Sequence, residues 1–115
     1  MTEGSTVTQN PVESFPQTHQ DVVTSFRKKV EAISQVTKIE AASLDNGQHL
    51  IIVSTVKTNS QSVWNRLWDI EYDVHHQFEG TVINFLVLDA NQGHGPTDLD
   101  PYISKGVEFS SVFER

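Results

Sequence analysis

Residues 36–56, VTKIEAASLDNGQHLIIVSTV, decide the fold because they predict two strands joined by a turn. The first strand, 36–44, mixes alternation with β-branched residues, and the second, 48–56, has the apolar run LIIV at its centre. Asn46-Gly47 between them readily takes positive φ, which suits a tight hairpin turn. The unbroken apolar run predicts that both faces of the second strand are covered.

A helix is predicted upstream of this hairpin, over residues 19–34. Residues 18–21, THQD, have the form of a capping box, with a hydroxyl at the cap and a carboxylate three residues later. His19, at the start of this helix, is expected to face water. Apolar residues at spacings of four, four and three form one helical face, made of Val22, Phe26, Val30 and Ile33.

A second helix and a third strand are predicted downstream, over residues 60–79 and 81–88. Residues 58–60 supply cap candidates for this helix, and Gly80 ends it. The strand, TVINFLVL, has strong β propensity. The polar loop Asp89–Pro101 follows, and the apolar residues after it predict a short final helix or strand. The apolar stripe of the second helix consists of Val63, Leu67, Ile70, Val74 and Phe78.

These elements predict one α+β domain over residues 19–115, preceded by a disordered tail over 1–18. The tail has too few apolar side chains to offset its ordering entropy. The order helix, strand, strand, helix, strand plus a C-terminal segment predicts a small mixed sheet of three to four strands with helices on one face. The sequence leaves open whether the third strand is parallel to the second or lies at an edge.

Composition sets several function classes aside. The net charge of −7 disfavours nucleic-acid binding, since only Arg27-Lys28-Lys29 forms a basic cluster. The absence of cysteine excludes disulfides and thiolate metal sites. No apolar run is long enough to span a membrane, and the first residues do not form an ordinary signal peptide. We expect a water-soluble, cytoplasmic protein without membrane or nucleic-acid partners.

The strongest functional feature is an aromatic shoulder beside the apolar stripe of the second helix, formed by Trp64, Trp68, Tyr72 and His75. Large amphipathic aromatics beside a core are typical anchors of protein–protein interfaces. The alternative is that the final segment or the tail covers these side chains. The shoulder favours a non-catalytic interaction or assembly module, as a homodimer or as a subunit of a larger assembly.

Other candidate sites have a plainer interpretation. Asp69, Asp73 and His76 stand at helical spacings that metal sites use, as do Glu71 and His75, but the pattern favours a solvated polar face. The loop that begins at Asp89 has His94 at the sixth position and Asp100 at the twelfth, where a calcium loop has its glycine and its glutamate. No nucleotide-binding or nucleophile motif occurs. We therefore assign no catalytic, cofactor-binding or metal-binding residue and expect no cofactor.

The chain also resembles minimal nucleotidyltransferase-like proteins, and its second helix is similar to those of small uncharacterised bacterial proteins. The matching segments are Leu50–Val53, Ser60–Glu79, Val82–Leu88 and Lys105–Phe109. In that family, a Gly-Ser turn precedes two aspartates that hold magnesium. Here Asp45 is a lone acid, and Gln48 and His49 stand where the second carboxylate would be needed. The resemblance implies a fold without catalysis, and the alternative function is a degenerate domain that binds a nucleotide or metal through Asp45 and Asp89.

Overall fold

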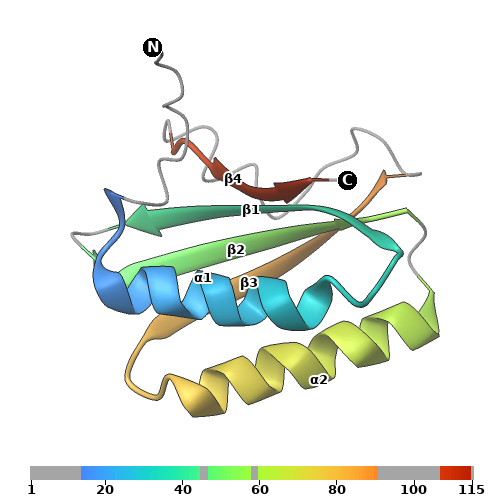
Figure 1. Cartoon of the computed structure of the whole chain (residues 1–115), viewed down its shortest axis with the longest axis horizontal. Coiled ribbons are helices and arrows are strands. Elements are labelled where there is room, and N and C mark those ends of the chain that lie inside the picture. Colours follow the sequence, from blue (N-terminus) through green and yellow to red (C-terminus); the bar gives the residue numbers. More distant parts are fainter. Residues whose placement is uncertain (1–13, 45–46, 58–59, 91–106, 115) are drawn as a thin grey trace.

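A computed structural model describes residues 14–44, 47–57, 60–90 and 107–114. These residues form two helices and one mixed sheet of four strands, with both helices on the same side of the sheet (Figure 1). The α+β class and the expected element order are confirmed. In chain order the elements are α1 (Gln17–Val30), β1 (Val36–Leu44), β2 (His49–Val56), α2 (Gln61–Gln77), β3 (Val82–Asp89) and β4 (Ser110–Glu114).

Helix α1 begins earlier than the capping-box pattern predicts. Pro16 is its N-cap, no side chain caps it, and Thr18 lies inside the first turn, so the predicted cap is wrong. The Gln20 side chain instead donates to the Phe15 carbonyl at 2.8 Å. Phe15 packs against the core, so the folded unit extends into the range expected to be tail. The rest of that tail lies outside the described residues.

His19 corrects a second expectation, because it is buried rather than hydrated. Only 1% of its surface is exposed, and its Nδ1 lies 2.7 Å from the Ser43 hydroxyl on β1. The reason is periodicity, since His19 precedes Val22 and Phe26 by three and seven residues on the core-facing side of α1. Burial, together with the nearby His49, lowers the pKa of His19 below its ordinary value, against a raising effect of the Gly47 backbone.

The hairpin forms where the sequence predicts it. β1 and β2 pair antiparallel from Val36–Val56 to Leu44–His49. The Gln48 amide donates to the Leu44 carbonyl at 3.1 Å, so the connection spans residues 45–48 and is longer than a two-residue turn. Gly47 has a φ of +88°, a conformation that side chains disfavour. Asp45 and Asn46 lie outside the described residues.

Helix α2 is the crossover between two parallel strands. β3 pairs parallel with β2 along its whole length, from His49–Val82 to Val56–Asp89. β4 pairs antiparallel with the other side of the hairpin, on β1, which gives the order β3-β2-β1-β4. β3 and β4 are therefore the two edges of the described sheet. The sequence leaves open whether the third strand is parallel to the second or lies at an edge, and β3 does both.

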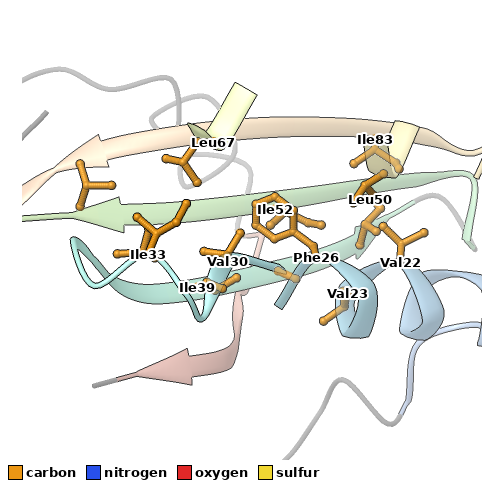
Figure 2. Close-up of a cluster of buried hydrophobic side chains, with 14 of the residues drawn as sticks. Val22, Val23, Phe26, Val30, Ile33, Ile39, Leu50, Ile52, Leu67 and Ile83 are labelled. Carbon is orange, nitrogen blue, oxygen red and sulfur yellow. The ribbon is translucent and has the colours of Figure 1, made fainter. Parts of the chain in front are cut away.

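The main core fills the space between the helices and one face of the sheet (Figure 2). The Phe26 ring on α1 is fully buried and lies 5.2 Å, centroid to centroid, from the Phe85 ring on β3. Leu50 and Ile52 on β2 face the same core. Ile51 and Val53 alternate with them and are buried on the opposite face, which confirms that β2 is covered on both sides.

Two glycines offer a matched test of the hairpin connection. Gly47 and Gly80 both have positive φ, so alanine costs about 1–2 kcal/mol at either position. A Cβ on Gly47 would also meet Pro16 Cγ at 2.6 Å, whereas a Cβ on Gly80 would meet no atom within 4 Å. We expect Gly47→Ala to lower the free energy of unfolding more than Gly80→Ala in denaturant titrations. Equal losses would contradict the close approach of Pro16 and Gly47.

Candidate functional site

Helix α2 leaves part of its surface without a partner because only a narrow stripe of it faces the sheet. Ser60 caps the helix, and its hydroxyl accepts a hydrogen bond from the Val63 amide at 3.4 Å. Val63, Leu67 and Val74 are buried, and Ile70 and Phe78 pack at the margin of the core. These five residues form the predicted apolar stripe. The side chains beside it are free to serve another purpose.

The four residues of the aromatic shoulder all lie at the surface. Trp64, Trp68 and Tyr72 expose 44%, 68% and 56% of their area, and His75 is also exposed. The described final strand cannot cover them, because β4 lies at the sheet edge opposite β3. The described chain thus leaves three large aromatic rings, on Trp64, Trp68 and Tyr72, successively one turn apart and in contact with solvent.

An open groove of about 660 Å³ lies between the shoulder and the edge strand β3. Trp68, Tyr72 and His75 line it from α2, and residues 83–86 line it from β3. The His75 ring meets the Phe85 ring edge-on, with centroids 5.4 Å apart. This groove unites three members of the shoulder, whereas Trp64 lies one turn away and does not line it.

A second hollow, of about 680 Å³, is lined by Trp68, Asp69, Tyr72 and Asp73. On a helix of 3.6 residues per turn, the two aspartates lie on one side of Trp68 and Tyr72, and the groove residues Glu71 and His75 lie on the other side. Trp68 and Tyr72 therefore form a ridge between two hollows, and both rings can be contacted from either side.

Glu71 is the electrostatically unusual residue of the groove. Desolvation by burial raises its pKa from an ordinary 4.5 to about 7. The other carboxylate of the groove belongs to Glu79, whose Oε1 lies 3.9 Å from Nδ1 of His76. The sequence shows Glu71 only as a possible partner of His75. Helical periodicity places Glu71 at the edge of the apolar stripe, and this position is the sequence signal of its partial burial.

The remaining sequence candidates do not converge on a chemical site. Asp69, Asp73 and His76 are exposed, as the solvated-face interpretation predicts. Within the described ranges, no group of three or more histidine, aspartate or glutamate side chains is arranged to hold a metal ion. Most of the loop Asp89–Pro101 lies outside the described residues. Among the described helices, none is long and apolar enough to cross a membrane.

Comparison with known proteins leaves the site to be interpreted on its own geometry. No protein-family model matches the chain, and neither the curated proteins nor the solved structures include a significant match. The resemblance to minimal nucleotidyltransferase-like proteins stays a prediction. What the groove can do must be inferred from its aromatic rings, its carboxylates and its edge strand.

The raised pKa of Glu71 predicts a pH-dependent effect of Glu71→Gln. The protonated carboxyl stabilises the fold below pH 4.5, and that contribution is lost as the pH rises through about 7. We expect the glutamine variant to be more stable than the wild type at about pH 8, by on the order of 1 kcal/mol after allowance for solvent screening. The difference should shrink toward zero at about pH 4.5 in chemical unfolding.

Glu79→Gln is the control, because it removes the same charge from the same groove, just after the end of α2, at a side chain that is 78% exposed. A Glu71→Gln difference that is the same at both pH values would contradict the partial burial of Glu71. Comparing variants with the wild type at each pH also removes the separate contribution of His19.

Proposed function

We propose that this protein is a non-catalytic interaction or assembly module that docks another protein chain on the ridge of α2 and the adjoining groove. The observation that carries the proposal is the exposure of Trp68 and Tyr72, at 68% and 56%, on a helix whose apolar stripe is already buried. Tyrosine and tryptophan are enriched among the residues that dominate interface energies. The acidic, cysteine-free composition supports a cytoplasmic setting.

The surroundings of the ridge support docking rather than catalysis. The groove is open, and it combines a helix face with an edge strand, two elements that other proteins use to bind partner segments. Ring surfaces on Trp68 and Tyr72 offer apolar area, while Asp69, Asp73 and Glu79 supply a polar rim. An apolar centre with a polar border is the usual composition of a protein–protein interface.

A degenerate nucleotidyltransferase-like domain is the second candidate function. The observation in its favour is that Asp89 stands at the carboxyl end of β3, beside the end of the parallel strand β2, where ligands bind in open α/β sheets. Calorimetry with ATP and Mg²⁺ tests this candidate. Heat of binding that is lost in Asp89→Asn would support it, and no heat of binding would remove it.

Self-association or partner binding through the ridge predicts a specific effect of Trp68→Ala and Tyr72→Ala. If the chain self-associates, light scattering across a concentration series will show a mass of twice 12.9 kDa. Each variant should then weaken association about tenfold or more. Because both side chains are exposed, the free energy of unfolding should change by less than about 0.5 kcal/mol.

If the chain is monomeric, an aromatic photo-crosslinking amino acid at position 68, which keeps a large ring there, replaces the mass measurement. Position 68 should capture a protein in cells, and Tyr72→Ala should abolish the capture. The same crosslinker at the exposed Thr24 on α1 is the control. A monomer that forms no crosslink specific to position 68 would contradict the proposed function.

A further inference from the structure

The occupant of the groove can be inferred from the edge strand that forms its floor. β3 pairs with β2 on one side only, and no described strand pairs with its other side. Proteins protect exposed sheet edges with lysine, proline or inward-pointing charge. The sequence of β3, VINFLVLD, has no charge before its last residue and no proline. An edge of this kind is suited to pairing with an added extended segment.

The charges around the edge indicate the sign of that segment. Glu71 and Glu79 line the groove, and Asp69 and Asp73 line the second hollow. No lysine or arginine of the described chain lines either hollow, and Arg66 on the same helix lines neither. Carboxylates placed beside exposed indole and phenol rings attract guanidinium and ammonium groups, through ion pairing and cation–π contact.

The same charges make a second copy of this chain, or the chain's own segments, a poor occupant of the groove. A two-fold pairing of β3 with β3 of a second copy would bring two sets of these carboxylates together in a chain of net charge −7. The first 13 residues carry Glu3 and Glu13 and no lysine or arginine. Residues 91–106 contain a single lysine, Lys105, with two aspartates. Electrostatic complementarity therefore favours a different, basic chain.

We propose that the groove between α2 and β3 binds an extended basic segment of a partner protein, which adds as a strand to the outer edge of β3. Alternate side chains of such a strand point to the same face. Its arginine or lysine residues contact Trp68 and Tyr72 and pair with the surrounding carboxylates. This inference rests on the proposed function and specifies the partner of the same site.

The test uses labelled synthetic peptides on the full chain, with binding followed by fluorescence anisotropy. A short peptide in which arginine and valine alternate should bind, and added salt should weaken it. The same peptide with glutamate for arginine should not bind. Methylation of alternate backbone nitrogens, which removes strand hydrogen bonds, should weaken binding about tenfold or more. Equal affinity of the methylated peptide would overturn the added strand.

Matched variants locate the binding site. Trp68→Ala should weaken binding of the arginine peptide about tenfold, and Trp64→Ala, at a side chain that does not line the groove, should weaken it much less. Asp69→Asn should weaken binding more than Asp21→Asn, which makes the same change in net charge on α1. Amide chemical shifts should change at residues 82–89. Shifts confined to α1 or β4 would overturn the assignment to this groove.

The pH dependence supplies a further readout. Ionisation of Glu71, whose pKa is about 7, adds negative charge to the groove as the pH rises. Tyr72, His75, His76 and Glu79 are the other titratable groups that line it, and residues 83–86 of β3 contribute none. The arginine peptide should therefore bind several-fold more tightly at about pH 8 than at about pH 6, and less so in Glu71→Gln.

The outcomes separate this inference from the proposed function. If the arginine peptide does not bind but position 68 still supports a dimer or a crosslink, the groove docks a protein and the basic strand is wrong. If the peptide fails and position 68 supports neither a dimer nor a crosslink, both proposals are wrong. Binding of the peptide that depends on Trp68 much more than on Trp64 supports both.

Discussion

The burial of β2 on both faces is the constraint on which the rest of the structure depends. Leu50 and Ile52 face the helices, while Ile51 and Val53 are buried on the other side of the sheet. β2 also lies inside the sheet, with a strand on each side. The hairpin supplies β1 as one neighbour, and the α2 crossover supplies β3 as the other.

That arrangement also determines which surfaces remain open. α2 buries its apolar stripe in the core that it shares with β2 and β3. Its aromatic side chains beside that stripe are left exposed by the part of the chain that the structure describes. β3 completes the pairing of β2 and becomes an edge itself. The open side of the helix and the open side of the strand meet along one groove. The candidate docking surface is thus a consequence of how the central strand is buried.

Much of the local structure could be predicted from the sequence because its patterns are local. The β1 strand, the Ser60 cap and the apolar stripe of α2 each depend on residues within a turn or two of one another. His19 was predicted wrongly because a polar residue at a helix start usually faces water, although its spacing from Phe26 places it on the buried face. The first-turn capping pattern was likewise overridden by Pro16.

The groove itself could not be predicted, because it depends on contacts between residues far apart in the chain. The shoulder residues follow from helical periodicity, but the approach of β3 to their side of α2 depends on strand order and on the parallel pairing with β2. The partial burial of Glu71 follows from the same approach. The carboxylates and the exposed rings form a candidate binding site only because the helix and the edge strand line one groove.

Amide hydrogen exchange of the free protein in dilute solution tests most directly whether β3 is an open edge. An internal strand has its amides bonded on both sides, so the amides of β2 should exchange at the slowest rate in the chain. If β3 is an open edge, its alternate amides, those directed away from β2, should exchange much faster. Uniformly slow exchange along β3, matching that of β2, would show that the edge is already covered and would contradict the account.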